Sequence, residues 1–419
     1  MKIAIIGTGI AGTGIAHLLH HYHDLTIYEK SDSPGGHSRT VTVDIDGGQI
    51  PVDTGFIVFN KRNYPLLTAL FKQLQVPIAK TNMSFGADIA GGWLQYGTYY
   101  KLRGLFAQKR NLFRPTYLRM LADIIRFNRN AHRYIEQETE LTLGELLTEM
   151  KLGKWFQDYY LLAMGAAIWS TPSQKMLDFP ALTFLRFFDN HGLLTVADHP
   201  QWYTVIGGSR EYVHRITEPF KDQIRLNCAV QAVERQEGFV TVTDQSGHRE
   251  HYDEVVFACH SDQVLKMLKN PTSAEQDIIG AIKYQANEMI LHTDTRFMPA
   301  RQQAWSSWVY QSSDRGNQNN QVSLSYWMNN LQPLQTETPV IVTLNPAGLP
   351  DPVKVLDRHT FEHPVFNSQA VAAQARMDEI QGQDRIWYCG AWQRYGFHED
   401  GLWSAVNVAG KMGIKPRWI

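Results

Sequence analysis

The sequence predicts an α/β fold with two units. One is a Rossmann-type nucleotide-binding domain, in which a parallel sheet is accompanied by a β-meander, and the other is a domain of mixed α+β structure. Three observations lead to this prediction: a glycine-rich turn after an apolar strand at the N-terminus, a second strand–glycine–helix pattern near the C-terminus, and a helix-rich, aromatic-rich segment between them. A chain of 419 residues is also too long for one small core.

The N-terminal stretch KIAIIGTGIAGTG predicts a strand, a tight turn and a helix. Lys2 to Ile6 form a short apolar run suited to a buried parallel strand. In the G-x-G-x-x-G spacing that follows, Gly7 permits the turn and Gly9 lets a pyrophosphate approach the backbone, while Gly12 lets the helix pack close to the strand. This helix is expected from about Ile10, and its first N–H groups would face an anion. A secretory signal is the alternative, but no small-residue cleavage site follows.

The second predicted strand, Leu25 to Lys30, supports a dinucleotide site. In this strand, Glu29 follows Gly7 by 22 residues. At this spacing an acidic side chain accepts hydrogen bonds from the ribose hydroxyls of a dinucleotide. We therefore expect Glu29 and the adjacent Lys30 at the nucleotide.

Two distant segments complete the nucleotide-binding domain. Residues 224–260 predict strands at Ala229 to Val233, Phe239 to Thr243 and Glu254 to Ala258, which form a meander that returns to the parallel sheet. Residues 385–412 predict a strand, Gly390, a loop and a helix from near Gly401, whose dipole faces an anion. This domain is thus expected to be discontinuous, at 1–81, 205–288 and 385–419, and the second domain to comprise 82–204 and 289–384.

Composition excludes several classes of protein. With 40 basic and 41 acidic residues the formal charge is −1, so nucleic acid is not an expected partner. No apolar run reaches the ~18 residues of a membrane span. The odd, dispersed cysteines Cys228, Cys259 and Cys389 favour buried free thiols and a cytoplasmic location. Four histidines, at positions 17, 20, 21 and 23, lack a completing carboxylate or thiol, so no metal site is expected.

Taken together, GTGIAG at Gly7 to Gly12, Glu29, PGGHSRT at Pro34 to Thr40 and the C-terminal Cys-Gly-Ala resemble the FAD-dependent amine oxidase superfamily. This superfamily includes monoamine and polyamine oxidases, protoporphyrinogen oxidase and carotenoid desaturases. The resemblance covers nearly the whole chain, with the motifs in the family's order. GGHSRT, VDTGFIVFN, MSF, LHTD and GFHEDGL are more closely similar to a bacterial subgroup of predicted flavoproteins associated with cyclopropane-fatty-acid synthases.

The resemblance implies FAD and a role for each matching residue. Gly35 and Gly36 would bring backbone close to the cofactor, and Ser38 or Arg39 would meet a phosphate, since His37 stands where relatives carry arginine. Thr54 to Phe56 would lie along the isoalloxazine, Val230 would bond the adenine, and Gly390 with Glu399 to Leu402 would hold the pyrophosphate and the pyrimidine side. The alternative is that Arg39 is a surface charge and that Glu399 and Asp400 only cap a helix. The predicted cofactor-binding residues are Gly7, Gly9, Ile10, Ala11, Gly12, Glu29, Lys30, Gly35, Gly36, His37, Ser38, Arg39, Thr54, Gly55, Phe56, Val230, Gly390, Glu399, Asp400 and Leu402.

Two departures from the family pattern affect the expected chemistry. Amine oxidases carry a lysine near flavin N5 on the strand that corresponds to about Ala286 to Asp294, and this strand has none; Lys283 lies a few residues earlier. Simple amine oxidation is therefore in doubt. No cysteine stands at the position that tethers flavin in monoamine oxidases, because Cys389 precedes the pyrophosphate glycine, so we expect non-covalent FAD.

A basic segment, Tyr99 to Arg133, carries nine cationic residues and one acid, Asp123. From Pro115 onward a helix is expected, with one apolar face made by Leu118, Leu121, Ile125 and Asn128. Three interpretations stay open: peripheral contact with the inner face of a membrane, a solvated helix packed on the second domain, or an acidic protein partner.

The first functional hypothesis is hydride transfer from a hydrophobic substrate, such as an acyl or isoprenoid chain, to FAD N5, with oxygen or a quinone-like compound as electron acceptor. Tyr395 and His398 are the candidates near the reacting centre, and Glu288 or His292 are candidate bases. The alternatives are a flavin amine oxidase for a small amine, and a non-redox flavoprotein that isomerises or presents a lipid. The substrate and the oligomeric state are not predicted.

Overall fold

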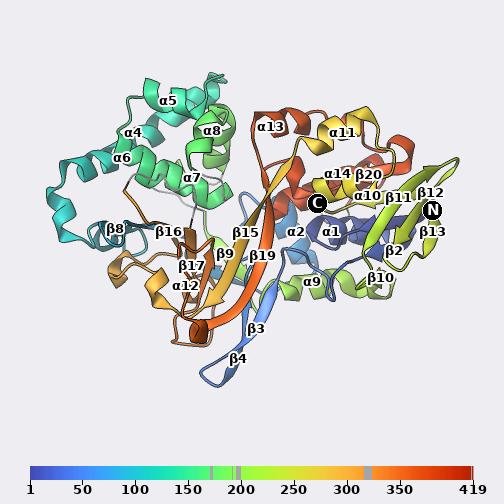
Figure 1. The fold of residues 1–419 in the computed structure, drawn as a ribbon, viewed down its shortest axis with the longest axis horizontal. Coiled ribbons are helices and arrows are strands. Elements are labelled where there is room, and N and C mark those ends of the chain that lie inside the picture. Colours follow the sequence, from blue (N-terminus) through green and yellow to red (C-terminus); the bar gives the residue numbers. More distant parts are fainter. Residues whose placement is uncertain (170–172, 191, 195–199, 316–322, 417, 419) are drawn as a thin grey trace.

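A computed structural model describes residues 1–419 except 170–172, 191, 195–199, 316–322, 417 and 419. Two lobes lie side by side (Figure 1). One contains a parallel sheet with helices and a meander, and the other a mixed sheet beneath a group of helices. This is the α/β architecture that the sequence predicts.

The nucleotide-binding lobe is built on a five-stranded parallel sheet. Its order is β10 (Ile224–Arg225), β2 (Asp24–Tyr28), β1 (Lys2–Ile6), β14 (Glu254–Phe257) and β20 (Ile386–Tyr388). The central strand β1 is apolar because it is covered on both faces. Helices α1 (Ile10–Leu19) and α14 (His398–Lys411) pack together against one face. The antiparallel meander of β11 (Val230–Gln236), β12 (Phe239–Asp244) and β13 (Arg249–Tyr252) covers the other.

The second lobe contains a seven-stranded sheet. Its order is β19 (Val355–Val365), β15 (Lys283–His292), β18 (Ile341–Leu344), β17 (Ser323–Trp327), β16 (Trp308–Ser312), β7 (Phe85–Ile89) and β8 (Leu94–Gly97). All neighbouring strands are antiparallel except β16 and β7. The long strands β15 and β19 pair along their length and run through the middle of the molecule, between the lobes (Figure 1).

The chain returns to the nucleotide-binding lobe directly after β19. Helix α13 (Ser368–Gln374) contacts α11 (Ser273–Gly280), and its Ala370 and Ala373 belong to the core formed with the meander. The last crossing thus lies near residue 366, whereas the sequence suggested 385.

Helices α4 (Pro115–Glu136), α5 (Leu143–Glu149), α7 (Leu162–Trp169) and α8 (Ala181–Asn190) lie over the mixed sheet (Figure 1). Helix α4 begins at Pro115 as expected, and its predicted apolar face is divided between the core and the surface. Tyr117, Met120, Phe127 and Ala131 enter the core of this lobe, whereas Leu118 and Ile125 are exposed. Of the other two residues of the predicted face, Leu121 is half-buried against the core and Asn128 is buried. Among the described residues, no helix combines the length and hydropathy needed to cross a membrane.

Helix α14 begins at His398, three residues before the predicted start, and its two acidic residues act as caps. The Asp400 carboxylate accepts from the Phe397 N–H at 2.9 Å within its own helix. The Glu399 carboxylate accepts from the N–H groups of Leu66 and Leu67 at 2.9 and 3.0 Å. These donors belong to the first turn of α2 (Pro65–Gln73), which otherwise lacks a side-chain cap.

The buried cap makes stability depend on pH. Burial raises the pKa of Glu399 to about 7 from 4.5. Between these values the folded chain holds more protons than the unfolded chain, so the free energy of unfolding falls as pH rises. Glu399→Gln removes this contribution. We expect the stability of the variant relative to the parent to rise by up to roughly 3 kcal/mol between pH 5 and pH 8, measured by urea denaturation. Glu140→Gln, at an exposed carboxylate, is the control for the lost charge. An equal difference at both pH values would contradict the prediction.

Candidate functional site

A cavity of about 2590 Å³ runs between the two lobes and is lined by both. One end is formed by the glycine turn after β1 and by Glu29 and Lys30, and the other end by aromatic and aliphatic side chains of the second lobe. A single small-molecule site usually occupies ~300–1,000 Å³. The cavity therefore has room for a cofactor and a substrate together.

The glycines of the first turn have the roles that the spacing predicts. A Cβ at Gly12 would lie 1.9 Å from the Gly7 carbonyl oxygen, so only glycine allows α1 to approach β1 this closely. A Cβ at Gly9 would meet no atom within 4 Å. Gly9 lines the cavity, so a ligand can approach its backbone there. A Cβ at Gly36 would lie 3.1 Å from the Gly9 Cα, so two glycine backbones form one wall.

Glu29 lies at the end of β2 with its carboxylate held in place. It accepts from the N–H of Thr8 at 3.2 Å and of Ser31 at 2.8 Å, and from the Thr8 hydroxyl. Glu29 lines the cavity together with Lys30, Ile10 and Ala11. This is the arrangement expected for an acid that receives ribose hydroxyls, and the residues present fit a dinucleotide.

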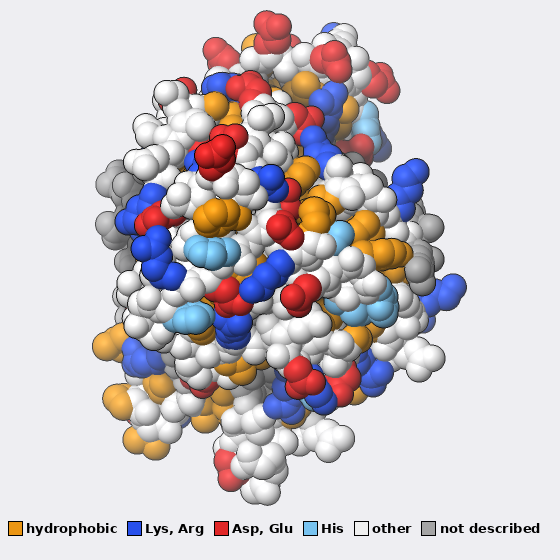
Figure 2. All heavy atoms as spheres, turned by 90° about the vertical axis from the view of Figure 1, so that its right-hand side faces the viewer, with side chains coloured by type: hydrophobic (Ala, Val, Ile, Leu, Met, Phe, Trp, Pro, Cys, Tyr) orange, Lys and Arg blue, Asp and Glu red, His pale blue; other side chains and the backbone are white. Residues whose placement is uncertain are grey.

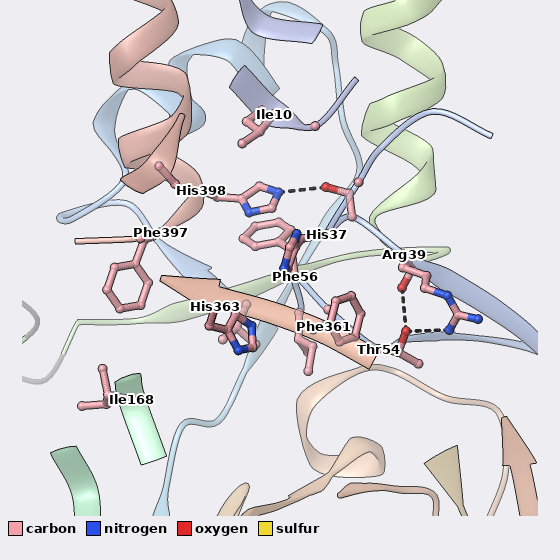
Figure 3. Close-up of a pocket in the computed structure, with 18 of the residues that line it drawn as sticks. Ile10, His37, Arg39, Thr54, Phe56, Ile168, Phe361, His363, Phe397 and His398 are labelled. Atoms are coloured by element: carbon pink, nitrogen blue, oxygen red, sulfur yellow. Dashed lines mark hydrogen bonds between the residues drawn. The ribbon is translucent and has the colours of Figure 1, made fainter. Parts of the chain in front are cut away.

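The PGGHSRT segment also lines the cavity, but its arginine is already paired. The Arg39 guanidinium donates to the two carboxylate oxygens of Asp357 at 2.7 and 3.2 Å, and to the Thr54 hydroxyl at 3.1 Å. Figure 3 shows Arg39 beside Thr54. A bidentate pair of this kind is strong and directional, so Arg39 ties two segments of the wall together. The expected role as a phosphate partner is not supported by this geometry.

Asp53 positions the strip Thr54 to Phe56. Its buried carboxylate accepts from Thr40 at 2.6 Å, from Ser209 at 2.8 Å and from Gln332 at 2.9 Å. Burial raises the pKa of Asp53 to about 6. Three distant segments thereby hold the strip that was expected along the isoalloxazine.

His398 lies against this strip. Its ring stacks on the Phe56 ring with centroids 3.8 Å apart, and its Nε2 is 2.8 Å from the Ser38 hydroxyl oxygen (Figure 3). Burial lowers the pKa of His398 to about 3, so the ring is neutral at ordinary pH. Tyr395 also lines the cavity, near Phe187. Both candidate residues near the reacting centre, Tyr395 and His398, thus line the cavity.

A row of ring side chains that the sequence analysis missed lies beside His37. The His37 centroid is 5.0 Å from Phe361, 5.6 Å from His363 and 5.6 Å from His260 (Figure 3). The sequence could have predicted this row. Alternate residues of a strand share a face, and in β19 these are His359, Phe361 and His363. Burial lowers the pKa of His363 to about 4 and of His37 well below its ordinary value. The imidazoles of His37 and His363 are therefore polar but uncharged.

Other predicted residues lie away from the cavity. Gly12 and Gly35 shape the turns behind it, and Glu399 and Asp400 cap helices as described above. Leu402 is buried in the core against α1. Thus Glu399 and Asp400 follow the capping alternative. Among the described residues the cavity wall includes Val230, Gly390, Cys228 and Cys259 but not Cys389.

The candidate bases on β15 do not reach the cavity. Glu288 is exposed and pairs with Arg358 at 3.1 Å. The His292 Nε2 contacts the Thr343 hydroxyl at 2.8 Å inside the sheet, and Lys283 is exposed at the strand's start. Of the residues of β15, only Tyr284 lines the wall. In the part of the chain that the structure describes, no group of three or more His, Cys, Asp or Glu could hold a metal ion.

The far end of the cavity is apolar. It is lined by Phe85, Tyr96, Tyr160, Met164, Ile168, Phe187, Leu193, Trp308, Tyr326, Leu344 and Phe366. Burial raises the pKa of Tyr160 to about 12, so its phenol stays neutral. The second lobe contributes one carboxylate to the wall among the described residues, Glu362, which lies 3.8 Å from His260 on the nucleotide-binding side.

Comparisons with known proteins agree with this arrangement. No curated protein matches the sequence. Three solved structures with similar folds are a CLA-producing fatty acid isomerase from P. acnes, a putrescine oxidase variant and a reduced UDP-galactopyranose mutase. Their TM-scores are 0.70, 0.69 and 0.67 at 14%, 14% and 16% identity. The matches cover 98% of this chain in each case, and 98%, 98% and 94% of the other chains. At these identities the likeness shows the fold alone.

The family assignment comes from the sequence. A family model described as flavin containing amine oxidoreductase matches residues 16–378, which is most of the chain. The chain therefore belongs to the flavin-containing amine oxidoreductases, and the cofactor of its cavity is FAD.

Proposed function

We propose that this FAD-dependent oxidoreductase oxidises a neutral, hydrophobic substrate, such as an acyl or isoprenoid chain. The observation that carries the proposal is the apolar far end of the cavity, where aromatic and aliphatic side chains form the wall. FAD, when bound, would supply a two-electron acceptor for a hydride from a substrate C–H bond, and oxygen or a quinone-like compound would accept the electrons afterwards. The proton lost from the neighbouring carbon would pass to a neutral histidine of the cavity wall or to water.

Charge favours this substrate class over amines. A protonated amine in an apolar cavity is stabilised best by a carboxylate partner, because an unpaired charge is costly to bury. Among the described residues, Glu362 is the one acid that the second lobe contributes, and it sits beside His260 at the other end. The family's lysine near flavin N5 has no counterpart on β15 within the cavity. Both features disfavour amine oxidation.

The chain's own residues bind, orient and exclude water. Gly9 and Gly36 let the diphosphate approach the backbone, and Glu29 receives the ribose. Phe56 and His398 form a stacked pair beside the strip Thr54 to Phe56. The apolar wall orients the chain of the substrate and keeps the reacting carbon dry.

A second candidate is isomerisation of an unsaturated lipid without net oxidation. It uses the same apolar wall. Burial lowers the pKa of His363 to about 4 and of His398 to about 3, so both rings are weak bases, and a reaction that returns the hydride to the substrate releases no net proton to them. The fold likeness to a fatty acid isomerase is compatible with it.

The first test measures flavin reduction directly. The holoprotein is mixed anaerobically with unsaturated or saturated acyl substrates, isoprenoids and small amines, and the oxidised flavin absorbance is followed. We expect bleaching by a hydrophobic substrate and none by putrescine or benzylamine. Bleaching by amines alone would overturn the proposal. Conversion of a lipid that needs previously reduced flavin, without net electron transfer, would replace it with the isomerase.

A second test separates cofactor binding from folding at two glycines. Gly9→Ala adds a Cβ where the cofactor approaches, so FAD affinity should fall roughly tenfold or more while the melting temperature of the apoprotein stays the same. Gly12→Ala adds a Cβ 1.9 Å from the Gly7 oxygen, so α1 must shift and the apoprotein should lose ~1–3 kcal/mol of stability. Flavin fluorescence titration and thermal unfolding check the two outcomes. Equal FAD affinity in Gly9→Ala and the parent would argue against this cradle.

A further inference from the structure

Apolar side chains project from the surface between β8 and the middle of α4. Twelve large apolar side chains are exposed among the described residues, and six of them lie between Tyr100 and Ile125. Leu102 is 71% exposed and Phe113 is 84% exposed. We call this surface the docking face; its apolar members are Tyr100, Leu102, Leu112, Phe113, Leu118 and Ile125.

The docking-face residues of helix α4 are separate from those that the helix packs into the core. Helix α4 fills the core of its lobe with Tyr117, Met120 and Phe127. Leu118 and Ile125 point elsewhere and remain exposed. The packing requirement of the helix is thus met without them, and large apolar patches on a surface usually mark an interaction site.

Cations alternate along the chain with the apolar residues of the docking face. Lys101, Arg103 and Lys109 are exposed, and none has an ion-pair partner within the described residues. Arg119 is 3.7 Å from Asp123, which also pairs with Arg126 at 2.8 Å. By contrast, Figure 2 shows acidic and basic side chains intermixed over the end of the nucleotide-binding lobe. Positive charge is therefore concentrated where the apolar side chains project.

The cavity reaches the docking face. Leu102 and Ile125 belong both to the exposed set and to the cavity wall, where Leu105 and Leu121 join them. The segment that joins β8 to α4 lies at the end of the molecule away from the marked termini (Figure 1). A molecule lying against this end can therefore reach the cavity through an apolar mouth.

We propose that the docking face binds the surface of an anionic lipid bilayer, with the cavity mouth turned toward the lipid. Projecting leucine and phenylalanine side chains enter the interface between headgroups and acyl chains, while the surrounding lysines and arginines meet the lipid phosphates. An acidic protein would match the charge, but it would not account for an apolar mouth. Docking itself is independent of the reaction; the passage of a lipid substrate through the mouth rests on the proposed function.

The test uses the full-length holoprotein and vesicles of phosphatidylcholine with or without phosphatidylglycerol. We expect co-sedimentation with the anionic vesicles at low salt, little with neutral vesicles, and a decline as salt is raised. Absence of binding to anionic vesicles at low salt overturns the proposal and leaves an acidic protein as the partner.

Two variants assign the binding to the docking face. Lys101→Glu with Arg103→Glu and Lys109→Glu should lower partition onto anionic vesicles roughly a hundredfold, and Leu112→Ser with Phe113→Ser roughly tenfold. Arg110 and Arg114 are left intact, because they donate to backbone carbonyls of Gly92 and Trp93. Binding equal to that of the parent in both variants overturns the proposal.

Matched controls carry the same changes elsewhere. One control makes the same change of net charge at three exposed lysines outside the docking face, in the triple variant Lys72→Glu, Lys80→Glu, Lys269→Glu. Leu349→Ser with Val353→Ser reproduces the loss of exposed apolar side chains. Both controls should bind vesicles nearly as well as the parent. In a Phe113→Trp variant, brominated lipid should quench more tryptophan fluorescence than in the parent, which has 11 tryptophans of its own. The difference reports insertion of residue 113 into the bilayer and needs no turnover. Loss of lipid-driven flavin reduction with docking intact would refute the proposed function alone.

Discussion

The contact between helix α1 and the backbone of Gly7 is the constraint on which the rest of the site depends. A side chain at Gly12 would collide with the Gly7 carbonyl at 1.9 Å. Its absence lets the helix lie directly on the strand and points the N-terminus of the helix at the cavity. A Cβ at Gly36 would lie 3.1 Å from the Gly9 Cα, so the glycine turn and the PGGHSRT segment lie close together because neither residue has a side chain.

The same helix holds the end of the chain in place. At Gly14 an added Cβ would lie 2.9 Å from Leu402 of α14, so small residues on α1 also admit the C-terminal helix. Helix α14 starts at His398, which stacks on Phe56. Segments separated by more than three hundred residues thereby form one continuous wall, and Glu399 extends the link to α2.

Sequence reasoning succeeded where a local rule decides the structure. The G-x-G-x-x-G turn, the first strands, two strands of the meander and the return to the parallel sheet follow from glycine geometry and from apolar patterns within short windows. The polar third strand of the meander, β13, was not predicted. It failed where the partner is remote. Arg39 pairs with Asp357, and Glu399 caps the first turn of α2. Both partners are more than three hundred residues away in the sequence, so no local pattern predicts either contact. The apolar face expected on α4 is divided, with Leu118 and Ile125 exposed, and the core is filled by Tyr117, Met120 and Phe127, which only the packed lobe identifies.

The pairing of β15 with β19 has a mechanical consequence. Their ladder is antiparallel from Lys283 opposite Val365 to His292 opposite Val355, with one irregularity near its end, and it crosses from one lobe to the other. Rotation of one lobe against the other would have to bend or twist this hydrogen-bonded pair of strands, which is stiffer than a single connecting segment. Large hinge opening is therefore resisted, and a ligand meets a chamber whose dimensions exist before it arrives. The width of the cavity entrance then limits which substrates can bind, and the protein reorganises little on binding.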